Sequence, residues 1–165
     1  LRRRGIDARL VIVGTGPMWK KIRELSQGHP VDTLGYICDR HRVAAILASA
    51  DISLAPGPLE TFCLSALESL ASGTPVVASA SSAVGEFLKL GAPVPAGAIA
   101  EDDFFSFADA IQDLLEARGA SEVARDVAED MPWEKSIARM RAIHKIDAIG
   151  ERAPHTSTRR RVRSA

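Results

Sequence analysis

Residues 57–79 read "GPLETFCLSALESLASGTPVVAS" and combine a loop, a short apolar helix and a buried strand. The loop covers residues 56–61, and a helix is predicted over about residues 62–72, where Gly73 ends it. The apolar run at residues 75–78 is then a strand. A helix that leads directly into a fully apolar strand is typical of α/β proteins with a parallel sheet.

The same alternation recurs outward from this segment. Residues 9–13, "RLVIV", form a β-branched strand that ends in a glycine turn, and a helix follows with Pro17 in its first turn. Further strands are predicted at residues 31–37, 52–55 and 92–95, and further helices at residues 39–48, 83–89, 102–117 and from Pro132 and Trp133 onward. The pattern predicts a Rossmann-like parallel sheet with helices on both faces.

Composition places the chain among ordinary globular proteins. Of 165 residues, 46% are hydrophobic and 25% are charged, and 21 basic residues balance 21 acidic ones. Because the net charge is zero, nothing global attracts the chain to nucleic acid, and no nucleic-acid partner is expected. Cys38 and Cys63 form no CxxC or Cys/His pattern, so no metal site is expected and a reducing cytoplasm fits best.

The last residues differ from the rest. Residues 151–165, "ERAPHTSTRRRVRSA", are rich in arginine and poor in apolar side chains. Such a segment cannot bury enough apolar surface to fold, so we expect a basic disordered tail. Weak electrostatic contact with anionic lipid or RNA is the alternative interpretation.

The glycine turn Gly14-Thr15-Gly16-Pro17 lies where doubly wound sheets bind ligands, between a strand and a helix N-terminus. It does not match the dinucleotide fingerprint GxGxxG, because Trp19 stands at the position of the third glycine. This argues against an NAD-dependent dehydrogenase. A tight turn without a ligand is the alternative interpretation.

Glu60 and Glu68 stand eight positions apart around the predicted helix. Eight helical residues rise about 12 Å, whereas the paired carboxylates of glycoside hydrolases lie about 5–9.5 Å apart. The longer span instead fits two hydroxyl-bearing ends of a nucleoside diphosphate sugar, with the helix N-terminus between them free to meet the diphosphate. Two glutamates on a helix surface without any ligand remain the alternative.

Several motifs together resemble one known family. "VGTGP", "LGYI", "ASADISLAPGPLETFCLSALESLASGTPVVAS", Gly85-Glu86 and "PWEKSIARM" are similar to the carboxy-terminal, donor-binding domain of GT-B retaining glycosyltransferases of the GT4 family. The resemblance runs from about Arg9 to His144, and E-x7-E followed by GTPVV is its most specific part. "APGPLETF" looks especially like GDP-mannose-dependent α-mannosyltransferases. Residues 1–150 would then form one nucleotide-sugar-binding domain.

The resemblance implies a role for each site residue. Glu60 would be the catalytic-site residue that binds hydroxyls of the transferred sugar, and Glu68 would bind the ribose. Asp39 would accept hydrogen bonds from guanine N1 and N2, which uracil cannot offer, so GDP is favoured. The remaining expected contacts are the cleft glycines Gly14 and Gly16, the base-binding strand end Tyr36 and Ile37, and the backbone of Phe62, Cys63 and Leu64 around sugar and diphosphate.

The resemblance also implies what lies outside these residues. The donor would be GDP-mannose or another nucleoside diphosphate hexose, with no metal or cofactor, and the acceptor a lipid or glycan read by a separate amino-terminal domain. The full enzyme would be cytoplasmic and touch the inner face of the membrane peripherally. Cys63 replaces a glycine of the family, and the family's Arg/Lys diphosphate clamp has no counterpart here, so this chain alone is expected to be inactive. A non-catalytic nucleotide-binding module is the alternative function.

Overall fold

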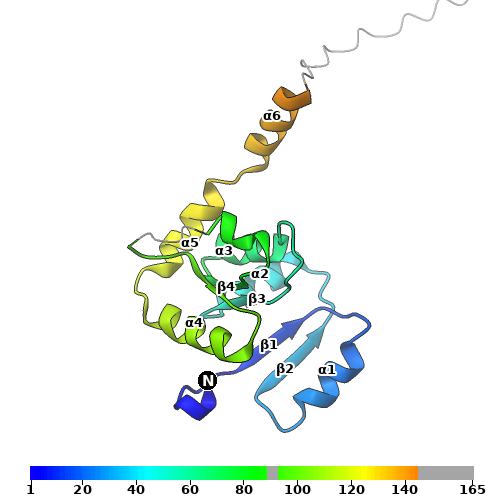
Figure 1. Ribbon diagram of the computed structural model, residues 1–165. Coiled ribbons are helices and arrows are strands. Elements are labelled where there is room, and N and C mark those ends of the chain that lie inside the picture. Colours follow the sequence, from blue (N-terminus) through cyan, green and yellow to red (C-terminus); the bar gives the residue numbers. More distant parts are fainter. Residues whose placement is uncertain (89–92, 145–165) are drawn as a thin grey trace, which may run out of the picture. The chain divides into compact units, whose positions relative to one another are not determined.

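The computed structural model describes residues 1–88 and 93–144, and Figure 1 shows its ribbon. Strands and helices alternate along most of this length. In chain order the elements are η1 (Arg2–Arg4), β1 (Leu10–Val13), α1 (Trp19–Ser26), β2 (Val31–Gly35), α2 (Arg40–Ala48), β3 (Ser53–Ala55), α3 (Leu64–Ala71), β4 (Val76–Ser79), η2 (Ala83–Glu86), β5 (Gly97–Ala100), α4 (Phe104–Glu116), α5 (Ala120–Glu129) and α6 (Trp133–His144).

The chain divides into two compact units. The first is Leu1–Asp130, and the second begins at Met131 and contains α6. Among the described residues, no helix has both the length and the apolar character needed to span a bilayer. The predicted basic tail, residues 151–165, lies outside the described residues.

The strands of the first unit form two parallel sheets (Figure 1). β1 pairs with β2, while β4 lies between β3 and β5. Parallel neighbours require a crossover connection, and α1, α3 and the segment through η2 supply these connections. The predicted Rossmann-like α/β fold is confirmed. Within the described residues, however, its strands form two sheets, because no pairing joins β1 to β3.

The core lies around β4, whose four residues are all buried. Val76 packs in a cluster with Leu70 of α3 and Val127 of α5, whereas the next residue, Val77, packs with Leu114 of α4. Successive residues of a strand point to opposite faces. Helices therefore cover both faces of the three-stranded sheet, as the sequence predicts.

Two predicted elements differ in the structure. The strand predicted at residues 92–95 is wrong, because β5 is Gly97–Ala100. Pro93 and Pro95 carry no amide hydrogen that could join a sheet ladder. Gly97, in contrast, allows β5 to approach β4 closely, because a Cβ at this position would collide with the Val76 carbonyl. The helix predicted at residues 83–89 is the 3-10 turn Ala83–Glu86 in its described part.

Candidate functional site

Three segments leave the carboxyl ends of β3, β4 and β5 and therefore lie along one edge of that sheet. The loop after β3 carries Glu60 and Phe62, and the segment after β4 runs into η2. The amide of Ala83 donates a hydrogen bond of 3.0 Å to the Glu60 carbonyl. The rings of Phe62 and Phe87 lie 5.6 Å apart. The loop with the predicted sugar-binding residues is thus held against η2.

Cys63 ends this loop and is the N-cap residue of α3, with left-handed backbone angles of φ 61° and ψ 77°. Among the described residues it is the one non-glycine residue with positive φ. This conformation costs an ordinary residue about 1–2 kcal/mol, a penalty that glycine avoids. The geometry gives a physical reason for the glycine that the resemblance places here.

Glu60 and Glu68 are both exposed, one in the loop and the other within α3. Within the part of the chain that the structure describes, neither carboxylate takes part in an ion pair or a side-chain hydrogen bond. α3 begins at Leu64, so its first amides lie between the two glutamates in the sequence. Both carboxylates are therefore available to a ligand that spans the helix N-terminus.

A second group of predicted residues gathers at the ends of β1 and β2. The Gly14 amide donates a 2.7 Å hydrogen bond to the Gly35 carbonyl, and both glycines have positive φ, 113° and 71°. Gly16 follows in the turn before α1, and a Cβ at Gly16 would meet nothing within 4 Å. Tyr36, directly after β2, is 75% exposed. The strand ends are therefore adjacent and open, as a nucleotide cleft requires.

Asp39 has a structural role at the start of α2. It is the N-cap of α2, and its Oδ1 accepts hydrogen bonds from the amides of His41 at 2.9 Å and Arg42 at 3.4 Å. Both bonds use one oxygen. Among the described contacts, Oδ2 has no partner and stays available to a donor such as guanine.

Contacts between α2 and α3 connect the two groups of predicted residues. α2, which Asp39 caps, packs on α3, and the Thr74 hydroxyl donates a 2.6 Å hydrogen bond to the Leu47 carbonyl at the end of α2. In the described residues, no hydrogen bond or ion pair directly joins the residues at the ends of β1 and β2 to the loop that carries Glu60. Among the described residues, the two groups are therefore linked through α2 and α3 rather than by a direct hydrogen bond or ion pair.

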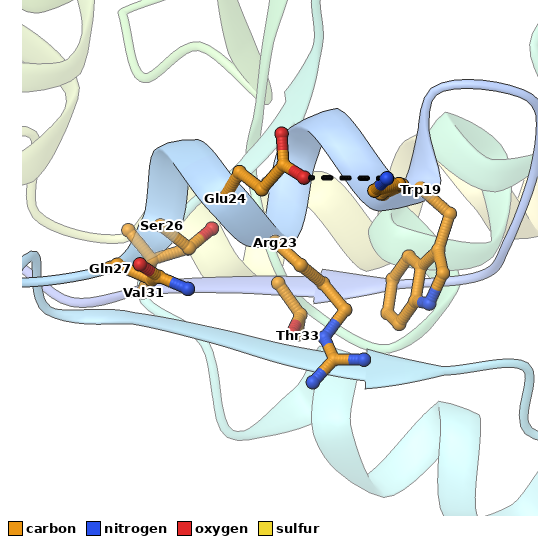
Figure 2. A pocket seen from close by; sticks show the side chains of 8 residues that line it. Trp19, Arg23, Glu24, Ser26, Gln27, Val31 and Thr33 are labelled. Atoms are coloured by element: carbon orange, nitrogen blue, oxygen red, sulfur yellow. Dashed lines mark ion pairs between the residues drawn. The ribbon is translucent and has the colours of Figure 1, made fainter.

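One surface hollow lies apart from the predicted site residues. It has a volume of about 460 Å³ and lies between α1 and β2, where Trp19 and Arg23 face Thr33 (Figure 2). None of the predicted site residues lines it, and an ion pair of 4.0 Å between Lys20 and Glu24 occupies its rim. The geometry at the strand ends therefore defines the candidate site better than the size of a cavity does.

The sequence interpretation missed a polar cluster at the same sheet edge. The carboxylate of Asp102, after β5, accepts hydrogen bonds from the hydroxyls of Ser79 and Ser81, after β4. These bonds, Ser79 first, hold the pKa of Asp102 below its ordinary value, while partial desolvation opposes them. The available signal was a run of serines after one strand and of carboxylates after the next. Among the described residues, no group of His, Cys, Asp and Glu side chains is arranged to hold a metal ion.

A model of the family described as "Glycosyl transferases group 1" matches residues 1–117. The chain belongs to this family. A GDP-mannose-dependent alpha-(1-6)-phosphatidylinositol dimannoside mannosyltransferase of Mycobacterium tuberculosis is 42% identical over 154 residues, 92% of this chain. An MMP alpha-(1->4)-mannosyltransferase of Mycolicibacterium hassiacum is 40% identical over 85 residues, 50% of this chain. The chain spans 39% of the first relative and 20% of the second.

Solved structures share the glycosyltransferase fold. A sucrose-phosphate synthase from Thermosynechococcus elongatus superposes with a TM-score of 0.70 and 27% identity, over 83% of this chain and 38% of that one. Anabaena HepE in complex with UDP gives a TM-score of 0.62 at 18% identity, over 82% of this chain and 41% of that one. The fold is therefore that of one half of a GT-B glycosyltransferase.

Proposed function

We propose that this chain binds GDP-mannose as the donor-binding part of a retaining mannosyltransferase. The observation that carries the proposal is the 42% identity, over 92% of the chain, with a relative whose name specifies GDP-mannose as donor. The geometry supports it, because Glu60 and Glu68 flank the N-terminus of α3 with both carboxylates available. That arrangement suits a ligand with hydroxyls at both ends and a diphosphate in the middle.

Each end of the donor would meet one group of residues. Glu60 would accept hydrogen bonds from the mannose hydroxyls, and Glu68 from the ribose. The backbone of Phe62, Cys63 and Leu64 would approach the sugar and the diphosphate. Gly14, Gly16, Tyr36 and Ile37 would line the nucleotide cleft, and Oδ2 of Asp39 would accept from guanine.

Transfer would depend on positioning and electrostatics. In a retaining transfer the sugar leaves the diphosphate and the acceptor attacks from the same face, so no side-chain nucleophile is required. The protein would hold the sugar and stabilise the negative charge that develops on the leaving phosphate. We propose that no metal or cofactor takes part.

The acceptor would be a lipid, by analogy with the Mycobacterium tuberculosis relative. An acceptor-binding domain and a cationic diphosphate clamp would come from the part of such an enzyme that this chain does not match. We place the enzyme in the cytoplasm at the inner face of the membrane. Two free cysteines, Cys38 and Cys63, are consistent with a reducing compartment. A non-catalytic nucleotide-binding module is the second candidate, because strained Cys63 lies where the sugar would approach.

Calorimetric titration of the purified chain with GDP, UDP and NAD tests the proposal. We expect weak GDP binding, about −4 to −6 kcal/mol or a Kd in the high micromolar to millimolar range, because one half of a cleft contacts one side of the ligand. UDP should bind about tenfold more weakly, since uracil lacks the paired N1 and N2 donors that guanine would offer to Asp39. Preference for NAD would instead indicate a dehydrogenase-type domain.

A further inference from the structure

Asp102 connects the end of β5 to the end of β4. One carboxylate oxygen accepts a hydrogen bond from the Ser79 hydroxyl, and the other accepts one from the Ser81 hydroxyl over 2.7 Å. Ser79 is fully buried, and its Oγ also accepts from the Ser81 amide over 3.1 Å. A single carboxylate thus bridges two hydroxyls of one turn, with both hydrogen bonds strengthened by its charge.

The turn that Asp102 holds leads directly to Glu60. The amide and the hydroxyl of Ser82 both donate to the Ser79 carbonyl, over 3.1 and 2.9 Å. The next amide, of Ala83, donates to the Glu60 carbonyl over 3.0 Å. A continuous series of hydrogen bonds therefore runs from Asp102 through residues 79–83 to the Glu60 backbone, and such networks stabilise geometry beyond the sum of their pairs.

Asp102 also lies beside the other end of the same loop. A hollow of about 370 Å³ is lined by Asp102 together with Pro56 and Pro58, which precede Glu60 in the loop after β3. The two prolines restrict the backbone on that side. The Glu60 loop is thus held by the Ala83 hydrogen bond on one side and has a proline-restricted backbone on the other.

From these contacts we propose that Asp102 is a positioning residue for the donor sugar, because it fixes the 79–83 turn and through it the Glu60 backbone. The inference rests on the proposed function, in which Glu60 binds the mannose. Asp102 itself would touch neither sugar nor nucleotide. Its removal should therefore weaken the contribution of the mannose to binding, while Glu68, which lies on α3, keeps its contacts to GDP.

The neighbouring carboxylate provides a matched control. Asp103 caps α4 by accepting hydrogen bonds from the amides of Phe105 at 2.8 Å and Ser106 at 3.0 Å. Asp103→Ala removes a carboxylate one position away and costs helix stability, yet it leaves the 79–83 turn intact. A loss of sugar binding that follows Asp102 but not Asp103 cannot be ascribed to a general loss of stability.

The experiment uses the ¹⁵N-labelled full chain, titrated with GDP and with GDP-mannose by NMR. Asp102→Ala should reduce the affinity for GDP-mannose about three- to tenfold, the effect of losing one or two hydrogen bonds, and change that for GDP by less than about twofold. Asp102→Asn should retain part of the additional affinity that GDP-mannose has over GDP. Asp103→Ala should lower the melting temperature and leave the ratio of the two affinities unchanged.

Amide hydrogen exchange supplies a readout that needs no ligand. The Ala83 amide should exchange faster in Asp102→Ala than in Asp103→Ala, because its bond to Glu60 loses support. Ser81→Ala, an exposed substitution that removes one of the two bonds, gives a smaller effect in the same direction and serves if Asp102→Ala fails to fold. Unchanged Ala83 exchange and unchanged preference for GDP-mannose would overturn the positioning role. Faster exchange in a chain that binds neither nucleotide would show that Asp102 supports the Glu60 backbone and would overturn the proposed function instead.

Discussion

Gly57 lies directly against the side chain of Glu60: a Cβ at Gly57 would be 3.2 Å from Cγ and 3.3 Å from Oε1 of that glutamate. A methyl group at this position would require the exposed Glu60 side chain to shift by a few tenths of an ångström. We therefore expect Gly57→Ala to lower the affinity for GDP-mannose about threefold, a fraction of one hydrogen bond to a charged group. Affinity for GDP, measured on the same variant, should stay unchanged and is the internal control. Equal losses for both ligands would contradict a sugar-binding Glu60.

The left-handed backbone of Cys63 makes a prediction about stability. Cys63→Gly should raise the free energy of unfolding by about 0.5–1 kcal/mol, because relief of strain outweighs the extra chain entropy of glycine. Ala71→Gly, at an exposed position of α3, is the control and should lower stability by about 0.5–1 kcal/mol. Urea denaturation of the two variants measures both changes. A destabilised Cys63→Gly variant would show that the Cys63 side chain contributes more than its backbone conformation costs.

The two glutamates should differ in what they bind. Glu68→Ala should weaken GDP binding by about 1.5–3 kcal/mol, the value of hydrogen bonds to a charged group. Glu60→Ala should leave GDP binding unchanged and remove the added affinity of GDP-mannose. Calorimetry with the two ligands separates the effects. If GDP binds Glu68→Ala as well as it binds the original chain, the ribose assignment is wrong.

Asp39 combines a structural and a proposed recognition role, and a substitution can separate them. Asp39→Ser keeps a good N-cap for α2 but removes the carboxylate that would face guanine. We expect the preference for GDP over UDP to fall from about tenfold to near equality, with little change in melting temperature. A variant that retains the preference would place base recognition elsewhere.

The carboxylate of Asp102 predicts a dependence of stability on pH. Its pKa in the folded state lies below the ordinary value of 3.8, chiefly because the Ser79 hydroxyl donates to the charged form, so the native state binds fewer protons than the unfolded state. The contribution of Asp102 to the free energy of unfolding is therefore complete above the pKa of the unfolded state. It is lost as the pH falls through the pKa of the folded state. Asp32, whose pKa the hydrogen bond from Arg9 lowers, acts in the same direction.

Denaturation between about pH 6 and 3 measures this dependence, since both relevant pKa values lie at or below about 4. Asp102→Asn should show a shallower decline of stability toward low pH than the original chain. The Asp32 contribution is common to both proteins and cancels in the comparison. Identical slopes would mean that the serine hydrogen bonds do not favour the charged form.

Residues 57–79 illustrate what local sequence could predict. The apolar run, the glycine stop at Gly73 and the following β-branched residues determine α3 and β4 by themselves. β5 was misplaced because apolar content around Pro93 and Pro95 outweighed the missing amide hydrogens. Asp102 was missed for a different reason: its contacts with Ser79 depend on β4 and β5 being neighbours, which no local pattern specifies.

The site was predictable to the extent that one motif carries it. E-x7-E predicts Glu60 before a helix and Glu68 within it; in the structure Glu60 lies in the loop before α3 and Glu68 lies within α3, and their binding roles stay predictions. The backbone angles of Cys63 could not be read from the sequence, since a cysteine gives no sign of positive φ. The separation of the β1–β2 sheet from the other three strands was equally hidden, because pairing between distant strands is a property of the whole fold.

The most direct test of the central claim is mannose transfer by a chimaera. The corresponding 154-residue segment of the Mycobacterium tuberculosis relative, 42% identical, is replaced by this chain, so that the rest of that enzyme would supply the proposed acceptor domain and diphosphate clamp. With radiolabelled GDP-mannose and a membrane extract, we predict a labelled glycolipid, none with UDP-glucose, and none from the chimaera carrying Glu60→Ala. A folded chimaera that binds GDP-mannose yet forms no labelled lipid would contradict the account and favour a non-catalytic nucleotide-binding module.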